Sequence, residues 1–201
     1  MFVGALQALR KGADMCGRYV LWEDEPDELF QEFVYRFHEK FPEYDLSSGE
    51  MAPGQLVPVI VNDLEPELFS WGYPGFQGGK LLINARAETV RTKRMFQESV
   101  YRRRCIVPTT GFFEWSKAKR PHLLNQQGGG VLYLAGLYEK VVGGPNRLVI
   151  LTTAAVGVAA EVHDRMPLIV PKERLLDWLT NTAYAVRHLE AQMPEMEKRE
   201  Y

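Results

Sequence analysis

The sequence predicts an α+β fold, a single domain with an antiparallel, barrel-like β core and flanking helices. Short apolar runs of five to nine residues recur along the middle of the chain, and glycine-rich turns such as Gly143-Gly144-Pro145 separate several of them. One amphipathic helical pattern precedes these runs and two follow them. The 201 residues suffice for one sizeable core but would leave two small halves if divided.

The first predicted element is a helix over residues 27–41. Apolar residues recur there at helical spacing, and the pattern ends before Pro42, which disfavours helical backbone in the residue before it. Residues 44–54 have the composition of a loop. The apolar face of the predicted helix consists of Leu29, Phe30, Phe33, Val34, Phe37 and Phe41.

Apolar, β-rich runs fill most of the remaining chain, and two helices over 172–181 and near 182–192 are expected to follow them. The domain is expected to span residues 15–195, with a frayed tail at 196–201. Residues 1–14 are interpreted as a leader, an upstream extension or a cloning remnant. The predicted strands are 56–62, 67–71, 80–84, 105–109, 111–115, 131–139, 147–153 and 167–171.

Charge is distributed unevenly along the chain. The formal net charge is −2, yet residues 80–120 hold eleven lysines and arginines against three glutamates, a net of +8. This segment either forms a phosphate-binding face or scatters its charges over a solvated surface. Cys16 and Cys105 have no metal-ligand spacing, and no apolar run approaches the ~20 residues of a membrane span. We expect a cytoplasmic protein without metal or organic cofactor and without a membrane partner.

Cys16 follows Met15 in the segment Met-Cys-Gly-Arg. If translation starts at Met15, or if the leader is removed, methionine excision leaves a cysteine with a free α-amine. The amine condenses with an aldehyde to an imine, and the neighbouring thiol then closes a thiazolidine ring. Both groups ordinarily have a pKa of about 8, so modest tuning makes either nucleophilic at neutral pH. The alternative is that Cys16 is an inert small apolar residue.

Two further residues are candidates for proton transfer. Glu114 lies between Phe113 and Trp115 in a very apolar run, where an unpaired carboxylate would be costly to bury. Strand alternation points it either to solvent or toward the Cys16 amine. His163 precedes Asp164 in a loop; it either has a structural role or transfers protons at neutral pH.

Candidate contacts to a nucleic acid lie in other segments. Asn84, Arg86 and Glu88 end one predicted strand, where alternation places them on one side, although an ordinary polar turn explains them equally. Asn84 could hydrogen-bond a sugar, and Arg86 could bind a phosphate bidentately. Trp71 is either a stacking surface for a base or a core residue. Arg18 is close enough to Cys16 in sequence to contact a phosphate.

Together and in this order, these segments closely resemble the SOS-response-associated peptidase family of abasic-site-processing proteins. The resemblance covers roughly residues 15–180. It rests on MCGRY at 15–19, MAPGQLVPVI at 51–60, SWG at 70–72, INARAET at 83–89, RRCIVPTTGFFEW at 103–115, LAGLYE at 134–139, ILTTAA at 150–155 and VHDRMPLIV at 162–170.

The resemblance implies a single α+β domain that binds abasic sites in single-stranded DNA. The N-terminal cysteine of such a protein forms a thiazolidine cross-link with the ring-opened sugar, which shields the lesion. By motif, Cys16 is the covalent residue. The resemblance further implies a protein that needs no cofactor, and we expect a monomer. The remaining matches are Asn84, Glu114 and His163 as polar active-site residues and Arg18, Trp71 and Arg86 as DNA contacts.

The sequence departs from the family slightly in TTGFFEW, which retains Gly111, Glu114 and Trp115, and more consequentially because fourteen residues precede Met15. While they are attached, Cys16 has an amide nitrogen and can form neither imine nor thiazolidine. Two other functions stay open. One is a thiol autopeptidase that uses Cys16 as nucleophile, and the other is a non-covalent binder of single-stranded or modified DNA.

Overall fold

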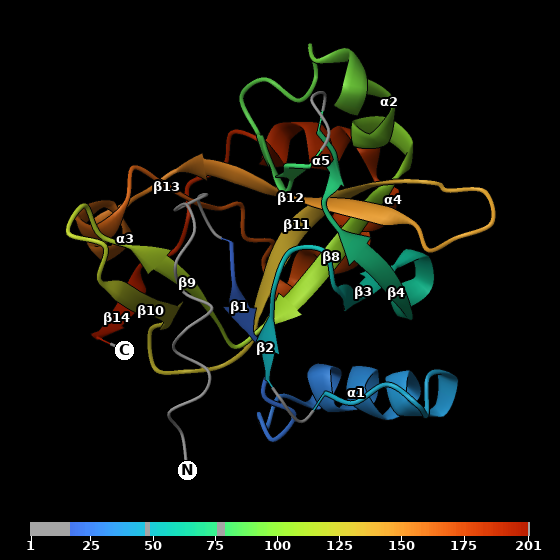
Figure 1. The fold of residues 1–201 in the computed structure, drawn as a ribbon, viewed down its shortest axis with the longest axis horizontal. Helices are drawn as coiled ribbons and strands as arrows, with labels where there is room; N and C mark the ends of the chain where they lie inside the picture. The colour runs from blue at the N-terminus through green and yellow to red at the C-terminus, as the bar shows by residue number, and fades with distance from the viewer. Residues whose placement is uncertain (1–16, 47–48, 76–78, 201) are drawn as a thin grey trace.

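Five strands close into a ring at the centre of the molecule (Figure 1). The computed structural model describes residues 17–46, 49–75 and 79–200. Neighbours in the ring are antiparallel, except that β4 and β12 are parallel over two residue pairs. The α+β class is confirmed, and the ring provides the barrel-like core. In ring order the strands are β11 (Leu132–Glu139), β8 (Arg104–Thr109), β3 (Leu56–Val61), β4 (Glu65–Trp71) and β12 (Arg147–Ala154).

Strand β12 continues beyond the ring and gains a partner on each side. The short strand β7 (Asn84–Arg86) pairs with it in parallel, and β13 (Arg165–Pro167) pairs with it antiparallel. Two segments that are far apart in the sequence, INARAET and HDRMP, therefore flank the same strand. A separate pair is formed by β5 (Tyr73–Pro74) and β6 (Leu81–Leu82).

A second sheet has the order β14-β10-β9-β1-β2. The expectation that residues 196–201 fray is wrong for 196–200, because these residues form an antiparallel edge strand on β10, and Met196 is buried. Strand β2 also lies inside the segment expected to be a loop. The strands are β1 (Tyr19–Val20), β2 (Glu50–Met51), β9 (Gly111–Trp115), β10 (Pro121–Gln126) and β14 (Met196–Glu200).

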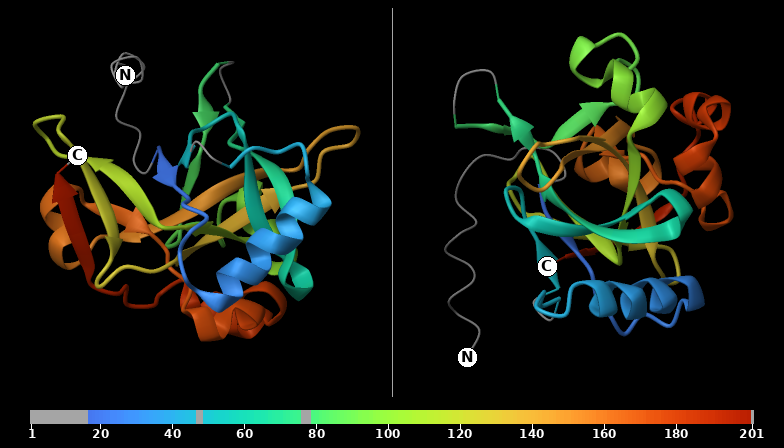
Figure 2. Two further views of the ribbon diagram at one scale, coloured as in Figure 1. Left: turned by 90° about the horizontal axis from the view of Figure 1, so that it is seen from below. Right: turned by 90° about the vertical axis from the view of Figure 1, so that its right-hand side faces the viewer.

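Helices flank the ring, as Figures 1 and 2 show. Helix α1 (Glu28–Lys40) confirms the first predicted helix; the Asp27 side chain caps it by accepting a hydrogen bond from Phe30 N at 2.9 Å, and its apolar face packs on β4. Helix α2 (Arg94–Arg102) covers β8 and β11, and α4 (Leu175–Thr180) covers β8 beside α5 (Thr182–His188). Among the described residues, no helix is long and apolar enough to cross a membrane.

Other differences from the predicted elements are local. Strand β13 covers residues 165–167, whereas the predicted strand at 167–171 contributes one isolated bridge between Ile169 and Leu134. The helix expected at 172–181 begins as the 3₁₀ turn η3 (Lys172–Arg174) before α4, and a second 3₁₀ turn, η2 (Asn62–Leu64), joins β3 to β4. The sequence did not indicate α2 or α3 (Gly157–Val162). Cys105 is buried, as expected, and burial raises the pKa of its thiol.

Candidate functional site

Glu114 lies on the strand that pairs with the first described residues. Phe113 N donates to Arg18 O at 2.9 Å, and Tyr19 is in register with Phe112, so the backbone that leads into β1 runs beside this part of β9. Glu114 is only 2% exposed, which excludes the interpretation that alternation points it to solvent. Cys16 lies outside the described residues, but it is covalently joined to Gly17, and consecutive Cα atoms are about 3.8 Å apart.

The sheet face that carries Glu114 also carries His122. The two residues are direct register partners on β9 and β10, so their side chains share one face. Lys198 of β14 is on the same face, because its register partner Leu124 lies two residues from His122. Lys198 donates to Glu161 of α3 at 2.7 Å, which fastens that helix over the edge of the sheet (Figure 1). His163 directly follows α3, the helix that contacts β14 at the edge of this sheet.

His163 directly follows α3, and its ring makes two contacts through Nδ1. The Arg165 N–H points at Nδ1 from 3.0 Å, and Asp164 Oδ1 is also 3.0 Å away. One nitrogen cannot accept from an amide and donate to a carboxylate at once, so the contacts belong to two protonation states. In the neutral ring, Nδ1 accepts from the amide and the proton is on Nε2. In the imidazolium, Nδ1–H faces Asp164, which is 84% exposed and contributes little as an ion-pair partner.

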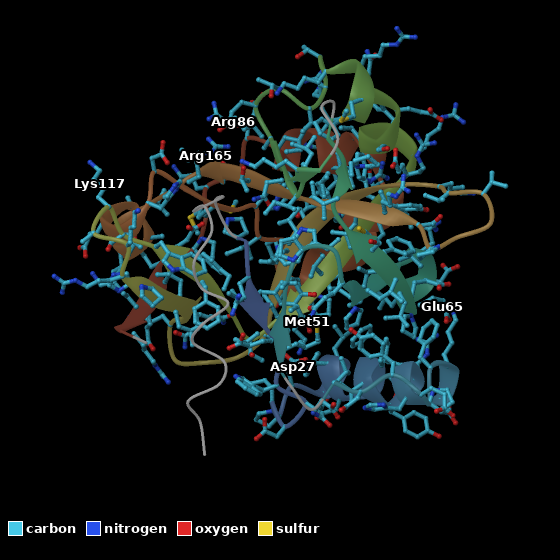
Figure 3. The ribbon with its side chains drawn as sticks, in the orientation of Figure 1. Asp27, Met51, Glu65, Arg86, Lys117 and Arg165 are labelled. Atoms are coloured by element: carbon cyan, nitrogen blue, oxygen red, sulfur yellow. The ribbon has the colours of Figure 1, made fainter. Side chains whose placement is uncertain are left out.

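Asn84 and Arg86 lie on one face of β7, as predicted. They are register partners of Ile150 and Thr152 on β12, and Ala85 between them is buried. The Arg86 side chain is exposed, and no hydrogen bond or ion pair joins its guanidinium to another residue in the described part of the chain. Figure 3 shows Arg86 near Arg165, which comes from β13 on the opposite side of β12.

Glu88 and Arg165 join the two segments that flank β12. Arg165 donates from both terminal nitrogens to the Glu88 carboxylate, at 2.5 and 2.8 Å, and also to Thr152 O at 2.6 Å. The Arg165 side chain is 10% exposed and that of Glu88 is 47% exposed. Hydrogen bonding by Arg165 is the main reason that the pKa of Glu88 lies below its ordinary value. This contact fixes the backbone beside His163, because the Arg165 amide is the donor to Nδ1.

Trp71 is a core residue, and its expected contact with DNA bases is wrong for this structure. It is fully buried, its Nε1 donates to Ile83 O at 3.1 Å, and its ring is 5.4 Å from that of Tyr19. A base cannot stack on a ring that neighbouring side chains already cover. Trp71 instead supports Tyr19, and with it the start of β1. Arg18 is partly exposed and pairs with Glu50 at 2.9 Å, so a phosphate would compete with that carboxylate.

The basic segment is mostly, but not entirely, exposed. Arg104 is buried and donates to Trp178 O, Leu179 O and Val100 O, so its guanidinium stabilises the packing of the core and cannot reach an anion in solvent. Arg103 pairs with Glu98 at 2.8 Å. The exposed remainder lies near β7 and α2 and at the turn between β9 and β10, where Figure 3 labels Lys117. Its members are Lys80, Arg86, Arg91, Lys93, Arg94, Arg102, Lys117, Lys119 and Arg120.

Two neighbours of the predicted residues were missed as parts of the site. His122 gave no sequence signal, since its relation to Glu114 depends on the register of the β9–β10 hairpin. Arg165 could have been found, because an arginine in HDRMP and a glutamate in INARAET are complementary charges. Among the described residues, no group of three or more histidine, cysteine, aspartate and glutamate side chains is arranged to hold a metal ion.

Comparisons with known proteins agree on one family. The family model described as SOS response associated peptidase (SRAP) matches residues 15–201. The abasic site processing protein YoqW of Bacillus subtilis is 33% identical over 182 residues, covering 82% of this chain and 80% of its own. The abasic site processing protein YedK of Escherichia coli is 30% identical over 179 residues, covering 82% and 79%.

Solved structures share the fold. A protein from Bordetella bronchiseptica superimposes with a TM-score of 0.73 at 22% identity, covering 92% of this chain and 99% of that one. A protein from Bacteroides thetaiotaomicron gives a TM-score of 0.72 at 22% identity, covering 91% and 90%. At these identities the likeness concerns the fold alone.

Proposed function

Because the chain belongs to the SOS response associated peptidase family, we propose that it processes abasic sites in single-stranded DNA by forming a thiazolidine cross-link through Cys16. The names of relatives such as YoqW and YedK support abasic-site processing. The observation that carries the covalent step is the buried Glu114 carboxylate on the strand that pairs with the backbone next to Cys16. A base at that position serves an α-amine at residue 16.

The reaction needs a free amine, an aldehyde and two proton transfers. Glu114 removes a proton from the Cys16 ammonium, and the amine attacks C1′ of the ring-opened sugar. The resulting carbinolamine loses water to give an imine. Sγ–H then adds across the C=N bond, which leaves a ring N–H, so one water and the proton taken from the ammonium are released in total. General-base assistance of this kind contributes about 10²–10⁴-fold.

His163 supplies the proton that opens the sugar. The acid is the imidazolium, in which Nδ1–H faces Asp164 and Nε2–H is free to meet the sugar. Nε2–H protonates the ring oxygen O4′ as the C1′–O4′ bond breaks, water takes the proton of the anomeric hydroxyl, and the imidazole is left neutral. Asn84 holds the sugar by hydrogen bonding, and Arg86 binds a phosphate beside it. An abasic site has no base to unstack, which favours lesions in DNA that is already single-stranded.

The test uses chain that starts at Met15 and has lost that methionine, incubated with an oligonucleotide that carries one abasic site. The expected product is a heat-resistant species of lower mobility on a denaturing gel. Cys16→Ser retains the amine, so it forms an imine that borohydride traps but no heat-resistant product. Absence of that product from protein with a confirmed free Cys16 amine would falsify the covalent proposal.

The thiol autopeptidase alternative is addressed in the same preparation. The family description contains the word peptidase, and the family match begins at residue 15. Autoproteolysis predicts that full-length chain cleaves itself at the Met15–Cys16 bond, which intact-mass measurement over time detects. If the mass stays constant in purified protein, a separate enzyme must remove the leader or translation must start at Met15.

A further inference from the structure

His122 lies directly across the hairpin from Glu114. The register of β9 and β10 pairs the two residues, and both are buried, with exposures of 8% and 2%. Directly opposite residues on antiparallel strands have Cβ atoms about 4.5–5.5 Å apart. No direct hydrogen bond joins the imidazole to the carboxylate among the described residues, so a proton passing between them crosses one water molecule or follows a small side-chain rotation.

The His122 ring has an unsatisfied buried atom. Its Nδ1 is inaccessible to solvent and has no hydrogen-bond partner in the described part of the chain. Leaving a buried polar atom without a hydrogen bond costs roughly 1–3 kcal/mol. A buried polar atom without a partner in a native structure therefore calls for an explanation, such as a bound water or ion or a role in catalysis. The titratable and charged residues that register and ion pairs place around this face are Glu114 of β9, Lys198 of β14 and Glu161 of α3.

Glu114 is poorly placed to exchange its proton with bulk water. At 2% exposure, a carboxyl group that has taken a proton from the Cys16 ammonium has little solvent to receive it. The same proton is needed again when the carbinolamine hydroxyl leaves as water. A neighbouring base that stores the proton between these two steps keeps Glu114 ionised in the interval.

We propose that His122 is a positioning residue for Glu114 that receives its proton at Nδ1 and returns it when the carbinolamine hydroxyl departs. The proposal depends on the cross-linking function above. The proton moves from the Cys16 nitrogen to a Glu114 oxygen and on to His122 Nδ1, which forms an imidazolium beside a carboxylate. It returns by the same path to the leaving hydroxyl, which departs as water and leaves an iminium. When Sγ adds to the iminium carbon, the thiol proton passes to solvent, so the neutral thiazolidine forms with release of one water and one proton.

The test compares His122→Gln with wild type between pH 5.5 and 8.5. The matched control is His38→Gln on α1, whose half-buried side chain pairs with Glu23 away from this sheet. The rate of cross-link formation should fall about 10- to 100-fold in His122→Gln near pH 7, less than the full effect of a direct base. The deficit should shrink as pH rises, because solvent increasingly deprotonates the amine. Binding to a tetrahydrofuran abasic analogue and the unfolding temperature should change little. His38→Gln should match wild type throughout.

Chemical rescue separates proton storage from a structural role. His122→Gly leaves space, and added imidazole should restore at least part of its cross-linking rate. A pH–rate curve of His122→Gln that parallels wild type, or a slow His122→Gly that imidazole does not accelerate, overturns the inference. If wild type itself forms no cross-link, the proposed function fails and the inference fails with it.

Discussion

Replacing Glu88 by glutamine removes the charge that faces the guanidinium of Arg165. Removing one partner of a fully buried ion pair costs about 3–5 kcal/mol. Here the Glu88 side chain is 47% exposed, so water screens the loss, and Arg165 retains its hydrogen bond to Thr152 O. We therefore expect a loss of about 1–2 kcal/mol in the free energy of unfolding. For a chain of this size, that corresponds to a fall in Tm of roughly 2–8 °C.

The effect should depend on pH in a defined direction. The folded state lowers the pKa of Glu88 below its ordinary value of 4.5, chiefly through the Arg165 hydrogen bonds. A depressed carboxyl pKa stabilises the fold fully above the unfolded value and loses that contribution as pH falls through the folded value. The difference between wild type and Glu88→Gln should therefore be largest near pH 7 and close progressively below pH 4.5.

Urea unfolding at pH 7 and at several values below 4.5 provides the measurement. Glu98→Gln is the matched control, since Glu98 pairs with Arg103 at 2.8 Å but is 65% exposed, and its replacement should have no measurable effect. Equal stability of Glu88→Gln and wild type at pH 7, or a difference that persists undiminished at low pH, would refute the assignment of Glu88 and Arg165 as a stabilising pair.

Three further predictions concern the site. Arg86→Gln should weaken non-covalent binding to single-stranded DNA in a fluorescence titration. It should also reduce the slope of log binding constant against log salt concentration by about 0.7 per lost phosphate contact. Replacing the exposed Lys140 by glutamine should leave both quantities unchanged. Trp71→Phe should destabilise the fold by about 2 kcal/mol in urea without altering preference for neighbouring bases; a selective change in that preference would contradict its burial. On denaturing gels, His163→Ala should slow cross-link formation with ring-closed abasic sites at least tenfold. Asp164→Asn should slow it much less, because Asp164 is 84% exposed. Equal effects of the two variants would contradict the assignment of His163 Nε2 as the proton donor.

Periodicity predicted the elements whose burial it encodes. Helix α1 carries a regular apolar stripe, and β8, β9, β11 and β12 are apolar runs. The helix and these four strands were therefore predictable from residue type. Helix α2 was missed because Lys93 at its N-cap position provides no side-chain cap, and five of its nine residues are polar or charged. Strand β14, with the sequence MEKRE, has none of the usual strand composition, since an edge strand with one solvated face tolerates charge.

The site was predicted in part for a similar reason. Residue type singled out Glu114 as a carboxylate in an apolar run, and the structure buries it. The position of His122 follows from a hairpin register that no local pattern specifies. For Trp71, composition allowed both core and surface, and only the packing of Tyr19 and Ile83 against it decided between them.

Ring closure also has consequences for the order in which this protein assembles. The parallel contact between β4 and β12 joins residues 70–71 to residues 147–148, and β13 then completes the site from residues 165–167. Such non-local pairings slow folding, because the entropy of closing a long loop is lost before the stabilising contacts between the strands form. On the ribosome, the N-terminal segment emerges long before β12 and β13 exist. Any aminothiol exposed early is therefore chemically competent before the residues that would direct it to DNA are in place.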